Sequence, residues 1–176
     1  MVVGTNLSHG GVMRRSGVLW AYRLVSISYQ VRPVKVSAHI PTPPEELLRF
    51  VADTRNDHLW CPNVETADLV EGDSVDVGSR FRFHQHLDRP FGKCIEFDVD
   101  VEIVELDDRS VKWHVTDRFQ DREIEISVEP QGEGSRITQV TQASFHKSPG
   151  LAKWLYPLLA RRTLKDQFRH LAWHFE

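Results

Sequence analysis

Two histidines separated by one residue, His84 and His86, form the pair whose spacing most directly suggests chemistry. Residues two apart on a β-strand point to the same side, so these imidazoles could hold a metal ion together. The same segment, GSRFRFHQHL at 78–87, also alternates like a half-buried strand, with Phe81 and Phe83 opposite the histidines. The stretch therefore allows two interpretations: a metal site, or the polar outer face of a sheet whose inner face is aromatic.

The segment that follows, KCIEFDVDVEIVEL at 93–106, favours the second interpretation because it alternates between apolar residues and carboxylates. A short connection, LDRPFGK, should join the two segments as an antiparallel hairpin, which places opposite charges across the outer face. The expected pairs are Phe83 with Phe97, Phe81 with Val99, Arg82 with Asp98, Arg80 with Asp100, and His84 with Glu96.

Metal binding remains an alternative because the two histidines resemble the start of the cupin motif. The glutamate that should follow in that motif is missing, and Pro90 stands near its place. His114 and His146 could complete a site, but their spacing does not require it, and a catalytic metal site needs three or more convergent ligands. We therefore favour the exposed-face interpretation, with no metal and no cofactor expected, and keep a cupin-like metal protein using His84 and His86 as an alternative.

Hydrophobic periodicity predicts one α+β domain. A strand at about 34–40 precedes a proline-initiated helix at about 43–53 and an irregular segment at 54–63. A meander of six strands follows, and the period then becomes helical from about 150 to 174. An antiparallel meander needs one face covered, and a helix of about 25 residues is long enough to cover it.

Composition limits the classes of function and location. The chain has 176 residues, 40% hydrophobic and 27% charged, with a formal net charge of −3, so it lacks the basic face of a nucleic-acid-binding protein. Cys61 and Cys94 imply no disulfide framework, and we expect a cytoplasmic location. No apolar stretch predicts stable membrane insertion. Residues 1–32 are expected to be a poorly ordered extension or a mis-assigned start, followed by a domain at 33–176, and a homodimer is left open.

The predicted inner face is apolar and aromatic, but three neutral polar residues interrupt it: Gln85, Gln139 and Thr141. A buried amide costs free energy unless it is hydrogen-bonded. These residues could form a satisfied network in a filled core, or they could orient the occupant of a cavity. The residues alone leave both possibilities open.

Several segments resemble the START-like (SRPBCC) superfamily, and within it the polyketide cyclase/dehydrase and lipid-transport branch. These segments are VSAHIPTPPEELLRFVAD, HLWCPNV with Trp60 and Pro62, VDVGSRFRF, and GEGSRITQVTQASF, and the resemblance covers about 34–176. It implies a helix-grip fold, in which a strongly curved antiparallel sheet of about seven strands wraps around a long C-terminal helix. One or two short helices are expected after the first strand.

The resemblance also implies a hydrophobic small molecule, such as a lipid, a polyketide or an aromatic compound, bound between sheet and helix. Carried onto this sequence, the lining residues would be Trp60, Phe83, Phe97, Trp113, Gln139 and Thr141 from the loop and sheet, and Leu158, Leu164 and Phe168 from the helix. The alternative function is a cyclase or dehydratase that uses one acid/base group in the same cavity.

The enzymatic alternative has few candidate acid/base groups: His58, Asp117, Arg118, and Arg161 or Arg162 on the helix. None forms a recognisable dyad, and the nucleophile-elbow, phosphate-loop and dinucleotide motifs are absent from the sequence. The basic residues of the terminal helix could contact an anionic membrane, but its apolar residues are expected to be needed in the core, which favours a solvated outer face.

Overall fold

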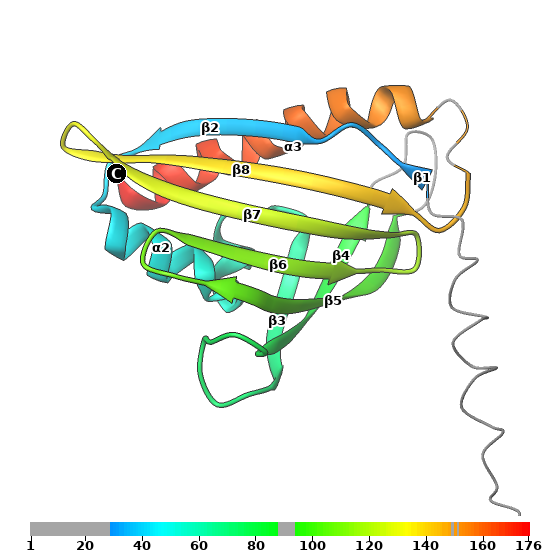
Figure 1. The fold of residues 1–176 in the computed structure, drawn as a ribbon, viewed down its shortest axis with the longest axis horizontal. Coiled ribbons are helices and arrows are strands. Elements are labelled where there is room, and N and C mark those ends of the chain that lie inside the picture. Colours follow the sequence, from blue (N-terminus) through cyan, green and yellow to red (C-terminus); the bar gives the residue numbers. More distant parts are fainter. Residues whose placement is uncertain (1–28, 88–93, 149, 151) are drawn as a thin grey trace, which may run out of the picture.

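The computed structural model describes residues 29–87, 94–148, 150 and 152–176 (Figure 1). Most of the expected N-terminal extension therefore lies outside the described residues. Its last residues do join the fold, because Val31 is buried and its N–H donates to the carbonyl oxygen of Ala143 at 3.1 Å.

The core of the molecule is one antiparallel sheet whose strands follow the predicted order, with a short additional strand, β1, at its start. Neighbouring strands pair in the order β1-β8-β7-β6-β5-β4-β3. Strand β2 also pairs directly with β8, along a different part of it from β1. The strands are β1 (Tyr29–Gln30), β2 (Val34–Ile40), β3 (Val64–Glu71), β4 (Arg80–Leu87), β5 (Ile95–Leu106), β6 (Ser110–Thr116), β7 (Gln120–Gln131) and β8 (Gly134–Phe145).

Helices cover one side of this sheet (Figure 1). Helix α2 (Pro44–Ala52) begins at a proline, whose missing N–H costs nothing in the first turn, and it buries Leu47, Leu48 and Val51. A 3₁₀ helix, η2 (Thr54–Leu59), follows it directly. The long helix α3 (Ala152–Phe175) runs along β2 and buries Leu164, Phe168 and Leu171. The predicted helix-grip architecture is therefore confirmed.

The hairpin of β4 and β5 differs from the predicted register by two residues. Phe83 lies opposite Val99, and Gln85 lies opposite Phe97. On the outer face Arg82 pairs with Asp100 rather than Asp98. The side-chain period of a strand is two, so this shift changes every partner but leaves every side chain on its predicted face.

The two faces of the hairpin differ as their alternation predicts. Phe81 and Phe83 are buried in the core together with Val99 and Val101. The outer face carries cross-strand ion pairs, including Arg82 with Asp100 at 2.9 Å. Exposed pairs of this kind contribute little stability individually. They place opposite charges next to each other across the two strands.

Candidate functional site

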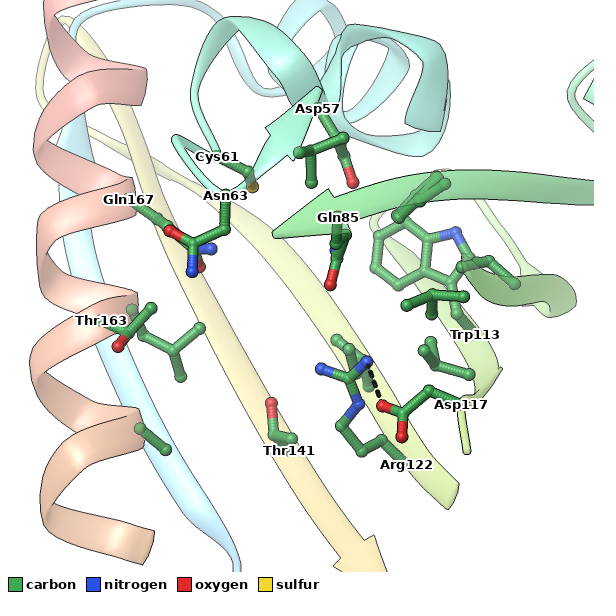
Figure 2. Close-up of a pocket in the computed structure, with 18 of the residues that line it drawn as sticks. Asp57, Cys61, Asn63, Gln85, Trp113, Asp117, Arg122, Thr141, Thr163 and Gln167 are labelled. Carbon is green, nitrogen blue, oxygen red and sulfur yellow. Dashed lines mark hydrogen bonds and ion pairs between the residues drawn. The ribbon is translucent and has the colours of Figure 1, made fainter. Parts of the chain in front are cut away.

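A cavity of about 360 Å³ lies between the inner face of the sheet, η2 and α3 (Figure 2). Its wall is mostly aliphatic and aromatic, with a smaller set of polar side chains. Three lining residues are exposed, Phe119, Leu159 and Thr163, and they mark where the cavity opens. Phe119 belongs to the β6–β7 turn and the other two to the middle of α3, so the opening lies between turn and helix.

Most of the cavity residues expected from the resemblance line this cavity. They are Trp60, Phe83, Phe97, Trp113, Gln139, Thr141 and Leu164. Phe168 lies in the core behind the wall, where its ring stacks on Trp60 at a centroid distance of 6.4 Å. Its contribution is to hold the Trp60 ring in place.

Leu158 lies outside the cavity, and its side chain is 68% exposed. An α-helix turns by about 100° per residue, which places Leu158 roughly 120° away from the buried Leu164. The residues of α3 that do reach the cavity are those on the other side of Leu164: Tyr156, Leu159, Ala160, Thr163 and Gln167.

Gln139 and Thr141 combine the two roles that the sequence left open. The Gln139 side-chain amide donates to the Thr141 hydroxyl at 3.1 Å, so each supplies a partner to the other. Both are buried and both line the cavity. They form a small polar strip on β8 within an otherwise apolar wall.

An ion pair, Asp117 with Arg122, lies on the cavity wall where β6 turns into β7 (Figure 2). The Asp117 carboxylate accepts from the N–H groups of Phe119 at 2.7 Å and Gln120 at 3.1 Å, and it lies 3.4 Å from a terminal nitrogen of Arg122. The Nε of Arg122 is buried and has no hydrogen-bond partner. The turn therefore holds a buried carboxylate that fixes the guanidinium beside the cavity.

A second polar cluster comes from η2 and the loop after it. Asp57, Thr54 and Cys61 line the cavity there, beside Trp60. Burial raises the pKa of the Asp57 carboxyl well above its ordinary value, and the nearby charge of Asp53 raises it further, although the Trp60 side chain acts in the opposite direction. Burial likewise raises the pKa of the Cys61 thiol. Burial therefore favours the uncharged forms of both groups at this end of the cavity.

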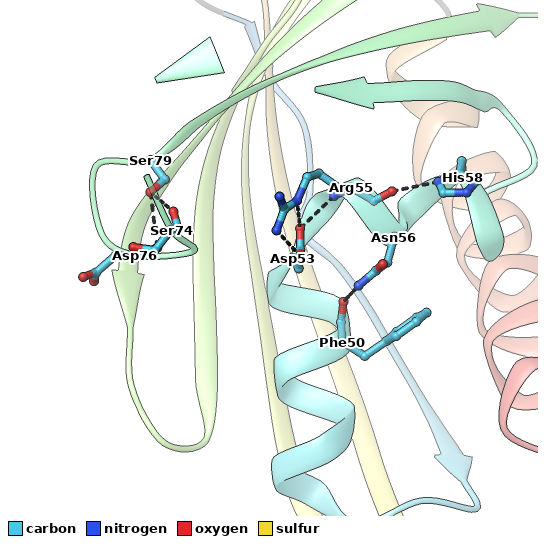
Figure 3. Close-up of polar contacts among 8 residues, drawn as sticks. All are labelled: Phe50, Asp53, Arg55, Asn56, His58, Ser74, Asp76 and Ser79. Carbon is cyan, nitrogen blue, oxygen red and sulfur yellow. Dashed lines mark hydrogen bonds and ion pairs between the residues drawn. The ribbon is translucent and has the colours of Figure 1, made fainter. Parts of the chain in front are cut away.

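Polar contacts hold the start of η2 against the end of α2 (Figure 3). Asp53 caps the 3₁₀ helix and pairs with Arg55 at 2.7 Å, and the Asn56 amide donates to the Phe50 carbonyl oxygen at 2.9 Å. His58, an expected acid/base candidate, is exposed, and its Nδ1 lies 2.7 Å from the Arg55 carbonyl oxygen. The cavity-facing acid on this helix is its neighbour Asp57.

The other acid/base candidates divide between wall and exterior. Asp117 lies in the cavity wall. Arg118 is exposed, with its guanidinium 4.6 Å from the centre of the Phe119 ring. Arg161 and Arg162 line a separate surface groove on the outer side of α3.

His84 sits among carboxylates on the outer face of the sheet. Its Nδ1 lies 3.1 Å from Asp98, and its Nε2 lies 3.9 Å from both Glu65 and Glu96. The hydrogen bond to Asp98 and the surrounding negative charges raise the pKa of His84, although desolvation opposes them. Within the described ranges, no three His, Cys, Asp or Glu side chains converge in a geometry that could hold a metal ion.

Comparison with known proteins gives the fold and the family. No curated protein matches the sequence. Among solved structures, a protein of Thermus thermophilus is 20% identical with a TM-score of 0.61, over 80% of this chain and 94% of that one. The major latex-like protein 151 of Panax ginseng is 18% identical with a TM-score of 0.62, over 84% of this chain and 99% of its own. At these identities, both show a shared fold.

The family model described as polyketide cyclase/dehydrase and lipid transport matches residues 32–176. That range includes every strand from β2 onward, both sides of the cavity and the whole of α3. The chain therefore belongs to the polyketide cyclase/dehydrase and lipid-transport family, whose fold binds hydrophobic ligands.

Proposed function

We propose that this protein binds one hydrophobic small molecule that carries a neutral oxygen group, such as a ketone or a hydroxyl, in the cavity beneath α3. The observation that carries the proposal is a largely apolar cavity whose wall holds buried polar atoms without partners. Such a combination is typical of small-molecule sites, where apolar surface supplies affinity and a few polar groups supply orientation.

The cavity volume limits the size of the occupant. Small-molecule sites range from about 300 to 1,000 Å³, and this cavity of about 360 Å³ is at the lower end of that range. One compact molecule fills it. Trp60 and Trp113 provide flat surfaces for an aromatic or polycyclic body.

The unpartnered atoms indicate the polar part of the ligand. The Nε1 of Trp113 and the Nε of Arg122 are buried donors without acceptors. Buried donors are almost always hydrogen-bonded, so we infer that a ligand oxygen, reached by a rotation of these side chains, supplies the acceptor that they lack. On the η2 side, Asp57 and Thr54 each have a buried oxygen without a partner.

Charge favours a neutral ligand over an anionic one. The positive charge of Arg122 is already balanced by Asp117, whose side chain is almost fully buried. A free carboxylate in the cavity would place a second negative charge beside this pair, and a buried charge without its own partner is costly. A carbonyl or hydroxyl oxygen can accept from Arg122 without that cost.

Prodan, a neutral aromatic ketone whose fluorescence shifts to the blue in apolar surroundings, is a suitable probe. Ala160→Phe places a large side chain into the cavity, and Val70→Phe places the same side chain on the exposed face of β3. We expect wild type and Val70→Phe to bind prodan, and Ala160→Phe to lose most of the binding. Equal binding by all three proteins, or no blue shift with wild type, would refute the proposal.

Cyclisation or dehydration in the same cavity is the second candidate function, and Asp57 is the observation that favours it. A protonated carboxyl at the wall can give its proton to a departing β-hydroxyl group, which leaves as water, and the resulting carboxylate can take the α-proton. Asp57→Asn would then retain prodan binding and lose turnover of a β-hydroxyketone. Retained turnover in that variant would exclude Asp57 from the chemistry.

A further inference from the structure

The first half of α3 exposes four large apolar side chains. They are Trp154 at 68%, Leu155 at 56%, Leu158 at 68% and Leu159 at 60% exposure. The sequence led us to expect such residues to pack into the core, whereas the core of α3 is built from Leu164, Phe168 and Leu171 further along. An exposed apolar cluster of this kind marks an interaction site. We name these four residues the apolar cluster.

The next two turns of the same helix carry a cluster of positive charge. Arg161, Arg162, Lys165 and Arg169 are exposed. The acidic residue among them, Asp166, is 3.1 Å from Arg169 and so balances one of the four charges. These four cations, the basic cluster, line a surface groove together with Leu158, so the apolar and basic clusters are continuous.

Apolar and basic residues are separated along the helix axis rather than mixed. At about 100° per residue, the two clusters together cover the side of α3 that runs from roughly 60° to roughly 220° around the helix from Leu164, with the apolar cluster nearer its N-terminal end. We call this the outward side of α3. An anionic bilayer has the same layered arrangement, with hydrocarbon beneath negatively charged headgroups. Trp154, at the apolar end, is the residue type that prefers the boundary between the two layers.

We propose that the outward side of α3 docks on an anionic membrane surface, with the apolar cluster below the headgroups and the basic cluster at the level of the phosphates. No described helix is long and apolar enough to span a membrane, so the contact is peripheral. The inference goes beyond the proposed function and connects to it through Leu159, which belongs to the apolar cluster and also lines the cavity at its opening. A docked molecule would bring that opening close to the bilayer.

A second copy of this chain is a poorer fit to the same surface. A two-fold interface places the same patch of each subunit against the other, so two basic clusters would be brought into one contact. Like charges brought together in an interface are unfavourable. An anionic bilayer complements both clusters, and the observations therefore favour it.

The test is sedimentation of the full chain with phosphatidylcholine vesicles, with and without roughly 30 mol% phosphatidylglycerol. We expect binding to the anionic vesicles alone, weakened by added salt because charge attraction is screened. The combined variant Arg161→Gln, Arg162→Gln, Lys165→Gln should lose about five-fold in affinity for each charge removed. Its matched control removes three exposed cations elsewhere, Arg32→Gln, Lys35→Gln and Arg136→Gln, and should bind like wild type.

The apolar cluster is tested with Trp154→Ala combined with Leu158→Ser, against Val70→Ser combined with Val77→Ser at exposed positions outside α3. The first variant should lose vesicle binding and the second should retain it. Prodan binding without vesicles should be unchanged in both, which separates failure of docking from failure of the proposed function. Equal binding to neutral vesicles, no binding to either kind, or a dimer that dissociates in the Trp154 and Leu158 variant would overturn the proposal.

Discussion

Asp117 and Arg122 face each other across the β6–β7 turn, with 3.4 Å between a carboxylate oxygen and a terminal guanidinium nitrogen. The carboxylate side chain is 2% exposed and that of the arginine 20%. Asp117 also accepts two backbone N–H groups, so one buried acid both closes the turn and holds the cation at the cavity wall.

Removing the cation should therefore destabilise the fold more than removing both charges. Arg122→Met leaves Asp117 buried without a counter-charge, and we expect a loss of about 3 kcal/mol in the free energy of unfolding. Adding Asp117→Asn to that variant should restore part of the loss. Urea unfolding of the three proteins measures this, and a double variant less stable than Arg122→Met would contradict the expectation.

Asp57 should make stability fall as pH rises. Its pKa is raised in the folded state, so the fold holds a proton that the unfolded chain releases above the ordinary value of 3.8. The free energy of unfolding should then decrease with pH from about 4 upward, by at most about 1.4 kcal/mol per pH unit, until the folded pKa is passed.

Asp57→Asn removes this proton and should flatten the dependence, so the variant gains stability relative to wild type between about pH 5 and 7 in urea unfolding. The measurement needs a control at about pH 4, where the two proteins should be most alike. Parallel stability curves for wild type and Asp57→Asn would contradict the assignment of a raised pKa.

His84 should titrate above an ordinary histidine because the carboxylate of Asp98 accepts from its ring. Its pKa is raised on folding, so its contribution to stability is complete at pH values below 6.5 and is lost as pH rises through the folded pKa. Asp98→Asn should lower the pKa of His84 in an NMR titration. An unchanged His84 titration in that variant would assign the shift to other charges.

Gly134 is required by the close approach of two chain segments. A Cβ atom at this position would collide with the carbonyl oxygen of Ile40 and the ring of His39. The carbonyl belongs to backbone that is paired in the sheet, so it cannot move away freely. Gly134→Ala should cost at least about 2 kcal/mol in thermal or urea unfolding. Gly132→Ala is a local comparison where the added atom meets open space and the cost comes only from its φ of 63°.

The faces of the strands could be predicted from the sequence, and their register could not. Alternation placed Phe81 and Phe83 inside, because a period of two leaves only two choices. The partners of those residues depend on the connection at 88–93, and no hydrophobic pattern determines its geometry. The prediction therefore differed by two residues while the faces were the same.

The polar part of the site shows which signals in the sequence were available. Arg122 has the same parity along β7 as Ile124, Ile126 and Val128, so alternation alone indicated that it points inward. Asp57 gave no such signal, because a single acid on a 3₁₀ helix has no period to follow. Leu158 was expected in the cavity because the family resemblance assigned the apolar face of the terminal helix to it, but Leu158 lies about 120° around α3 from Leu164 and is on the outside.

The pairing of β2 with β8 has a consequence for how the protein forms. Val36 lies opposite Gln139, so strands about a hundred residues apart in the chain become direct neighbours. Contacts between such distant segments are slow to form, since a long loop must close before any pairing is gained. During synthesis, the earliest strand of the family-matched region must wait for one of the latest, and its unpaired edge is a target for chaperones until then.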